Sequence, residues 1–276
     1  MKNIKEFNYK ILIESPGRVN LIGEHIDYNG GNVLPASIDK KIFLYFKKNL
    51  KNSICKVNST HYNEIITFKL KKEKKELNSN WKNYIFGVIH YLKKLKGDQL
   101  NGFECIIDSN LPLGSGISSS SALICGLIKG LNDLFKLKIS NHEMINISQK
   151  VEHNFIGVKG GIMDQFAIFF GKKDKIILLN CDTLNLKMID SKFSPYKFLL
   201  LNTNVNHNLS SSDYNRRVKE CESALKKIKI ENKKLSCLAN APEDYIIKNE
   251  PLFTKNEFKR ALYVSQENQR VLKSTK

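Results

Sequence analysis

The spacing of apolar residues along the chain predicts a mixture of short strands and amphipathic helices. Short or alternating apolar runs predict strands over residues 12–15, 41–47, 53–57, 64–70, 102–108, 175–179 and 197–202. Apolar residues at helical spacing predict helices over 81–95, 119–135, 142–155, 213–228 and 256–272. Strands and helices do not alternate regularly, so the pattern favours an α+β fold and disfavours a doubly wound sheet.

One segment suggests a division of the chain. The stretch SKFSPY, residues 191–196, is polar and contains Pro195, and charge density rises after it. A chain of 276 residues is long enough for two domains, each with its own core. We therefore predict one domain over 1–190 and a second over 191–276.

Composition narrows the class of protein. The formal charge is +18, but the lysines are scattered, only five residues are Arg, and aromatic and basic residues are not interleaved, so we expect no nucleic-acid partner. No apolar run is long enough to span a bilayer and no signal peptide is visible, so we expect a cytoplasmic protein without a membrane partner. The six cysteines form no C-x-x-C pair and are expected to be buried free thiols.

Candidate chemistry is densest in SPGRVNLIGEHIDYNGG, residues 15–31. This run places one Arg, a Glu-His-x-Asp cluster and four glycines between apolar runs, and Arg18 is the only Arg among the first two hundred residues. A guanidinium is a fixed, permanently charged fork of donors that suits a phosphate, whereas Lys is a flexible point charge. The segment is thus a candidate ligand site, the alternative being a polar turn between strands.

A second candidate is LPLGSGISSSSAL, residues 111–123, which joins a strand to a helix. Gly114 and Gly116 let the backbone approach an anion, and the amides and dipole of the helix start favour negative charge. The run lacks the Lys of a Walker loop and the third glycine of a dinucleotide fingerprint. Taken alone, it is equally compatible with a phosphate loop and with a serine-capped buried helix.

Three ordered motifs resemble those of the GHMP small-molecule kinases, and within them the galactokinases. These are GRVNLIGEHIDYNGG, the serine loop, and VEHNFIGVKGGIMDQF at residues 151–166. The segments WKNYIFGVIHY, SSSDYNRR and SQENQRVL are similar to galactokinase segments as well. The resemblance spans Ser15 to Leu272. It implies the two-domain GHMP fold, with an N-terminal domain like the second domain of ribosomal protein S5 and an incomplete ferredoxin-like C-terminal domain.

The resemblance also implies an activity, namely ATP-dependent phosphorylation of D-galactose at its anomeric hydroxyl, with Mg²⁺, by a monomer. The alternatives are a kinase for N-acetylgalactosamine, a catalytically impaired sugar- and ATP-binding sensor, and a truncated nonfunctional remnant. Asp164 and Arg18 match the catalytic pair, with Asp164 either a general base or an orienting group. The implied sugar-binding residues are Glu24, His25, Ile26, Asp27 and Tyr214. The implied ATP-binding residues are Gly114, Ser115, Gly116, Ile117, Ser118, Ser119 and Ser120, with Ser120 and Glu152 at the metal.

Individual residues keep simpler interpretations. Glu152 could be an exposed helix carboxylate, His25 a turn residue and Tyr214 an ordinary aromatic at a helix start. Trp81 is expected to pack in the core, the alternative being a place near the adenine. The chain also departs from the family pattern. Ile26 replaces a common threonine, Asn206 stands where an arginine is common, and the third glycine-rich motif expected beyond SQENQRVL is missing before Lys276. The resemblance therefore predicts an incomplete core after residue 191.

Overall fold

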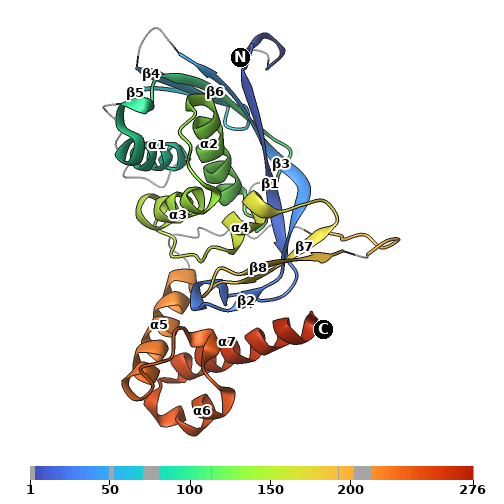
Figure 1. The fold of residues 1–276 in the computed structure, drawn as a ribbon, viewed down its shortest axis with the longest axis vertical. Helices are drawn as coiled ribbons and strands as arrows, with labels where there is room; N and C mark the ends of the chain where they lie inside the picture. Colours follow the sequence, from blue (N-terminus) through green and yellow to red (C-terminus); the bar gives the residue numbers. More distant parts are fainter. Residues whose placement is uncertain are drawn as a thin grey trace. The chain divides into compact units, whose positions relative to one another are not determined.

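The computed structural model describes residues 4–49, 53–70, 81–112, 114–191, 193–201 and 213–275 (Figure 1). The strands are β1 (Ile11–Asn20), β2 (Asn32–Val33), β3 (Pro35–Lys48), β4 (Ile54–Ser59), β5 (Glu64–Lys69), β6 (Phe103–Ser109), β7 (Lys175–Asn180) and β8 (Leu186–Asp190). The helices are α1 (Lys82–Lys96), α2 (Ser119–Phe135), α3 (Asn141–Val151), α4 (Met163–Phe170), α5 (Asp213–Glu231), α6 (Glu243–Lys248) and α7 (Lys255–Ser274). Within these described ranges, none of the helices has the length and apolar character that a membrane crossing requires.

The chain forms two compact units, and each is built from two separate stretches of sequence. The first unit contains residues 1–17 and 38–157, and the second contains residues 18–37 and 158–276. This grouping by spatial contact differs from the division at residue 190 that the sequence suggests. The segment 18–37, which carries the Glu-His-x-Asp cluster, thus belongs with the C-terminal part of the chain. The division of this chain into domains 1–190 and 191–276 stays a prediction.

The first unit is a five-stranded sheet with helices on one face (Figure 1). Its strand order is β1-β3-β6-β4-β5, with β3 antiparallel to β6 and β6 parallel to β4. Helix α2 lies close to the sheet because two glycines on it face large side chains. A Cβ on Gly130 would stand 2.0 Å from the ring of Phe46, and one on Gly126 would stand 2.6 Å from Leu44. These contacts hold the middle and the C-terminal half of α2 against the sheet.

The second unit combines a three-stranded antiparallel sheet, in the order β2-β7-β8, with helices α4 to α7. Helix α7 begins at a capping box in which Thr254 and Glu257 each accept from the other's backbone amide. It packs against α5, α6 and β2. The apolar side of this packing is made by Val218 and Cys221 of α5 and by Ala261 and Val264 of α7, all buried.

Most predicted elements are present, and the differences have local causes. Helix α2 has the predicted bounds, and α3 ends at Val151, after which the π-helix η5 (Glu152–Ile156) continues the predicted helix. The strand predicted over 197–202 is wrong where the structure describes it: residues 197–201 form no strand, and Phe198 and Leu199 are 58% and 80% exposed. An apolar run forms a strand only where a partner strand satisfies its backbone. Asn206 lies outside the described residues.

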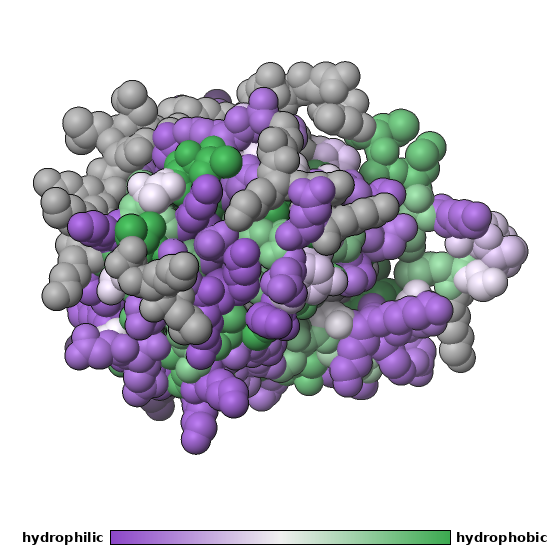
Figure 2. All heavy atoms as spheres, turned by 90° about the horizontal axis from the view of Figure 1, so that it is seen from above, coloured by the Kyte–Doolittle hydropathy of each residue, from purple (hydrophilic) through white to green (hydrophobic). Residues whose placement is uncertain are grey.

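The surface and the cysteines agree with the composition. Figure 2 shows hydrophilic side chains over most of the face it presents. The six cysteines are free thiols, and five of them are buried. Trp81 is buried in the first unit, where its ring stacks on Tyr62 at 5.4 Å and its Nε1 donates to Glu64 at 2.8 Å. The prediction of a core role for Trp81 is therefore confirmed.

Candidate active site

An ion pair joins the two predicted catalytic residues in the second unit. Arg18 lies near the end of β1 and Asp164 lies in the first turn of α4. The Nε atom of Arg18 donates to Oδ1 of Asp164 at 2.6 Å, and the two side chains are only 15% and 24% exposed. Burial by itself lowers the pKa of Arg18, but attraction to Asp164 outweighs it, so the pKa is raised and the guanidinium stays charged. The pair is a fixed, partly desolvated dipole.

Asp27 lies beside this pair and carries an unfavourable charge. It begins the short helix η2 (Asp27–Asn29). Burial is the main cause that raises the pKa of Asp27 to about 6, and repulsion by Asp164 adds to it. Gly161, just before α4, makes this arrangement possible, because a Cβ there would stand 2.3 Å from Oδ2 of Asp27. A perturbed carboxylate next to an ion pair is typical of a functional site.

The other two members of the cluster differ from each other in exposure. Glu24 is exposed, and its Oε1 accepts from the side-chain amide of Asn20 at 2.9 Å. The side chain of Ile26 is fully buried and packs against Gly31, where a Cβ would approach it to 2.8 Å. A sugar-binding role for Ile26 stays a prediction, and it would have to act through the backbone.

His25 lies in an aromatic cluster with two tyrosines. Its ring centroid is 5.4 Å from that of Tyr214 at the start of α5 and 6.0 Å from that of Tyr28. The backbone of His25 is left-handed, with φ of 61°. This uncommon conformation projects the imidazole from the loop toward α5, and aromatic faces of this kind suit the apolar surface of a sugar ring.

Helix α7 holds the loop that carries these residues. Oε1 of Glu267 accepts from the buried backbone N–H of Gly23 at 2.8 Å, and Oδ1 of Asn268 accepts from the backbone N–H of Asn32 at 2.9 Å. The hydroxyl of Tyr263 donates to the backbone carbonyl of Glu24 at 3.0 Å. The loop is therefore fixed at its beginning and at its end by one helix face.

The serine loop lies in the first unit, before α2. Gly114, Gly116 and Ser118 have positive φ values of 68°, 73° and 63°. Such alternation of left-handed residues turns successive backbone N–H groups to one side, which forms an anion-binding concavity. The side chain of Ser118 makes no capping hydrogen bond to α2, so serine capping does not explain the run. The local geometry favours the phosphate-loop interpretation.

The predicted metal-binding residues border this loop. Glu152 is buried at the start of η5 rather than on an exposed helix face, and its Oε1 accepts from the hydroxyl of Ser121 at 2.6 Å. Hydroxyl and carboxylate oxygens are the hard ligands that Mg²⁺ prefers, and Mg²⁺ needs only one or two of them from the protein. The donor set at Ser120, Ser121 and Glu152 fits that ion. No group of three or more His, Cys, Asp and Glu side chains gathers elsewhere in the described ranges.

Sequence reasoning missed several residues that the structure brings to these sites. Gly161, Tyr28, Glu267 and Asn268 were not singled out. Each contributes through a tertiary contact: Glu267 lies 244 residues from the amide it accepts from, and Asn268 lies 236 residues from its partner. The sequence signal was the polar run SQENQ. Three of its five residues, Ser265, Glu267 and Asn268, are buried in the structure, which is uncommon for polar residues of an amphipathic helix.

Two family models match this chain, one over the segment with the Glu-His-x-Asp cluster and one over the segment with the serine loop. The family "GHMP kinases N terminal domain" matches residues 83–172, and the family "Galactokinase galactose-binding signature" matches residues 4–48. A galactokinase of Clostridium acetobutylicum is 40% identical over 280 residues, covering 99% of this chain and 70% of the relative. The chain belongs to the galactokinase family.

Solved structures agree with this assignment. The crystal structure of Lactococcus lactis galactokinase complexed with galactose matches with a TM-score of 0.90 and 35% identity, covering 96% of this chain and 68% of that one. Mevalonate kinase of Methanococcus jannaschii matches with a TM-score of 0.58 at 18% identity, which shows the common fold alone. The predicted α+β GHMP kinase fold is confirmed. This galactokinase-family chain spans about 70% of the length of the curated relative.

Proposed function

We propose that this chain transfers the γ-phosphoryl group of ATP to the anomeric hydroxyl of D-galactose, which yields galactose 1-phosphate and ADP. The observation that carries the proposal is the Arg18–Asp164 ion pair beside Asp27, because it puts a charged donor and two carboxylates at one site. The family assignment and the galactose-bound relative from Lactococcus lactis support galactose as the sugar.

Asp164 and Arg18 divide the chemical work. The anomeric oxygen forms the new bond to the γ-phosphorus as the bond from that phosphorus to the bridging oxygen of ADP breaks. Asp164 accepts a hydrogen bond from the attacking hydroxyl. The proton of that hydroxyl passes to Asp164 or, when Asp164 only orients the sugar, to an oxygen of the transferred phosphoryl group. Arg18 holds Asp164 in place and stabilises the negative charge that develops on the transferred group.

Sugar recognition comes from the loop around η2. Glu24 and Asp27 accept hydrogen bonds from the other sugar hydroxyls, and an epimer that leaves a half-buried acceptor such as Asp27 unpaired is penalised. His25 and Tyr214 form an aromatic wall, 5.4 Å apart between ring centroids. Ile26 completes the loop by its backbone.

The serine loop is the proposed ATP site. Backbone N–H groups of residues 114–120 bind phosphate oxygens at the start of α2, where the helix dipole favours negative charge. Ser120 and Glu152 would hold Mg²⁺, with Ser121 orienting the carboxylate of Glu152. The ion supplies charge neutralisation on the phosphates when it is bound.

The setting of the reaction is part of the proposal. We expect the chain to act as a monomer in the cytoplasm, where ATP is available and where a reducing environment keeps the six thiols free.

Turnover with defined substrates tests this function. ADP release is followed with ATP, Mg²⁺ and D-galactose, beside a blank without sugar and an Asp164→Ala variant. The proposal predicts galactose-dependent ADP release that falls by at least about 100-fold in the variant. Folded protein that binds galactose without releasing ADP would overturn the kinase proposal and favour a sugar-binding role. Turnover with N-acetylgalactosamine in preference to galactose would overturn the sugar assignment alone.

A further inference from the structure

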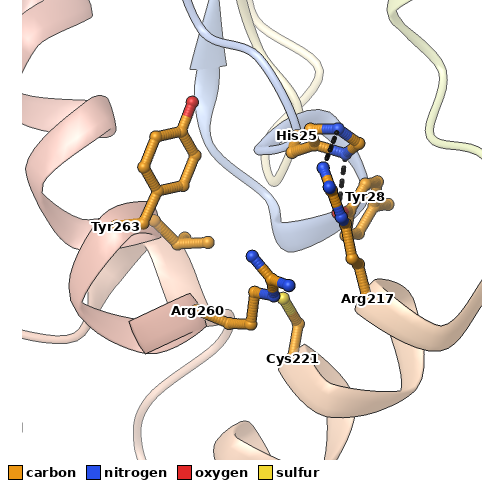
Figure 3. A pocket seen from close by; sticks show the side chains of 7 residues that line it. His25, Tyr28, Arg217, Cys221, Arg260 and Tyr263 are labelled. Atoms are coloured by element: carbon orange, nitrogen blue, oxygen red, sulfur yellow. Dashed lines mark hydrogen bonds between the residues drawn. The ribbon is translucent and has the colours of Figure 1, made fainter. Parts of the chain in front are cut away.

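A cavity of about 240 Å³ lies within the second unit, beside helices α5 and α7 and the loop of residues 23–32, here called the signature loop (Figure 3). It is lined by polar side chains of the loop and of both helices, together with Cys221 and Val264. Arg217 rises from α5 toward His25, while Arg260 extends from α7 beside Cys221 (Figure 3). Its lining includes neither Arg18 nor Asp164 and does not contain Asp27. The cavity is therefore distinct from the proposed catalytic pair.

The lining carries more positive than negative charge. Arg260 is paired, since its Nε donates to Oε2 of Glu220 at 2.9 Å. Arg217 forms no ion pair with any residue that the structure describes, and its buried Nε finds no hydrogen-bond acceptor there. A buried guanidinium donor without an acceptor is unfavourable unless a ligand supplies one.

His25 adds to this picture by remaining neutral. Arg217 can only donate, so the 3.1 Å contact from its Nη1 makes Nε2 of His25 the acceptor, and Nδ1 then carries the proton toward the hydroxyl of Tyr28 at 3.1 Å. Burial, followed by repulsion from Arg217 and Arg260, lowers the pKa of His25. The two arginines thus make the cavity electropositive, which disfavours protonation of the His25 imidazole.

The geometry points to a binding site for a small oxyanion of the phosphate class between Arg217 and Arg260, which we propose as a second ligand site of this chain. Guanidinium groups bind phosphate oxygens through charge-assisted, often bidentate hydrogen bonds. The volume lies below the roughly 300–1,000 Å³ that drug-sized ligands occupy, so it suits an ion or a short ester and not a nucleotide.

The proposed phosphate site is connected to the signature loop by hydrogen bonds. A phosphate held by Arg217 changes the electrostatic surroundings of His25, because Arg217 donates directly to its imidazole. His25 in turn forms a hydrogen bond with the hydroxyl of Tyr28, whose ring centroid lies 5.5 Å from that of Tyr214. Phosphate binding is therefore expected to alter the His25 resonance, and this expectation does not depend on any kinase activity.

Proton NMR of the imidazole groups provides the test. Inorganic phosphate is titrated into the full chain at constant ionic strength and pH, with sodium chloride as the replaced salt, and the His25 signal is identified by its loss in His25→Gln. A parallel titration with glycerol phosphate distinguishes a free ion from a phosphoester. The proposal predicts a saturable shift of the His25 signal in the millimolar range or below.

Two neighbouring arginines give a matched pair of variants. Arg216 is 63% exposed and does not line the cavity. It pairs with Asp213 at 3.1 Å and reaches Glu220, the partner of Arg260, only at 3.9 Å, so Arg216→Gln should keep the response. Arg217→Gln removes the same charge one residue later and should weaken phosphate binding at least tenfold. Arg217→Lys, which keeps the charge without the fork, serves if Arg217→Gln fails to fold, and should weaken binding severalfold. An unresponsive His25 signal, or equal responses in Arg216→Gln and the Arg217 variant, would overturn the proposal, even if phosphate stabilised the protein through the serine loop.

Discussion

The Nε atom of Arg18 lies 2.6 Å from Oδ1 of Asp164, although 146 residues separate the two in sequence. Their contact depends on both β1 and the start of α4 being in place. The fork of the guanidinium fixes the orientation of the carboxylate, which a lysine cannot do.

Arg18→Lys tests whether that orientation matters beyond charge. We expect the variant to lose about 100-fold or more in kcat/KM for galactose, equivalent to roughly 3 kcal/mol of transition-state stabilisation, because the ammonium keeps the charge but loses the fork. Steady-state ADP release measures the loss, and thermal unfolding checks that the fold is intact. A variant within threefold of the parent would show that only the charge of Arg18 is used.

Asp27→Asn separates stability from function. Because the pKa of Asp27 is raised to about 6 in the folded chain, its ionised form costs stability above pH 6, and that cost disappears as the pH falls toward about 4. The variant should gain roughly 1–3 kcal/mol of unfolding free energy at pH 8 and little at pH 4. Denaturant unfolding at the two pH values measures this difference.

The same substitution should damage sugar binding. In the parent chain, galactose affinity should decline as the pH falls through about 6, since a protonated Asp27 loses acceptor strength. Asp27→Asn should bind galactose weakly at every pH. Equal stability gains at pH 4 and pH 8, or undiminished galactose binding, would contradict this account of Asp27.

Glu267→Ala tests the contact between α7 and the signature loop. The variant leaves the buried N–H of Gly23 without its acceptor, and we expect it to lose about 1–3 kcal/mol of stability and to raise the KM for galactose more than that for ATP. Glu267→Gln keeps an oxygen acceptor and should be milder.

Glu257 supplies the control on the same helix. It is equally buried but binds Ser223 and Lys227 of α5 and not the loop. Glu257→Ala should therefore destabilise the chain without a selective effect on the KM for galactose. If both alanine variants change the two KM values alike, the contact with Gly23 has no specific role in positioning the loop.

Gly116→Ala tests the serine loop. Gly116 has φ of 73° and open space where a Cβ would stand, so the substitution adds backbone strain of about 1–2 kcal/mol without a clash. We expect a higher KM for ATP and an unchanged affinity for galactose. Gly97 at the end of α1 also has positive φ and open space, and Gly97→Ala should cost at least as much stability with no effect on ATP, because its ψ of −122° lies outside the left-handed helical region.

Local patterns predicted most of the fold. Helix α2 was predicted at its observed bounds because its apolar residues and the preceding glycine-serine run are both local signals. The strand expected over 197–202 failed for the opposite reason: Leu199 and Leu201 have strand character, but a strand also needs a neighbour, which sequence spacing does not reveal. Short elements such as α4 and β8 carried too few residues to show a period.

The candidate site was predicted from its resemblance to family motifs, because the chemistry of the single residues did not show which of them come together. Arg18 and Asp164 were paired only by resemblance, and the structure adds the distance between them. Glu267 and Asn268 could not be assigned from sequence, because their function consists of hydrogen bonds to a loop more than 230 residues away. Arg217 and Arg260 likewise become a pair only when α5 packs against α7.

The most direct test of the central claim measures binding and chemistry on the same preparation of Asp164→Asn. Galactose binding is followed by calorimetry, and galactose 1-phosphate formation is followed by phosphorus NMR with ATP and Mg²⁺. If Asp164 acts at the anomeric hydroxyl, the variant should bind galactose within about tenfold of the parent while product formation falls by at least about 100-fold. Product formation at the parent's rate would contradict the assignment of Asp164 to the reacting hydroxyl.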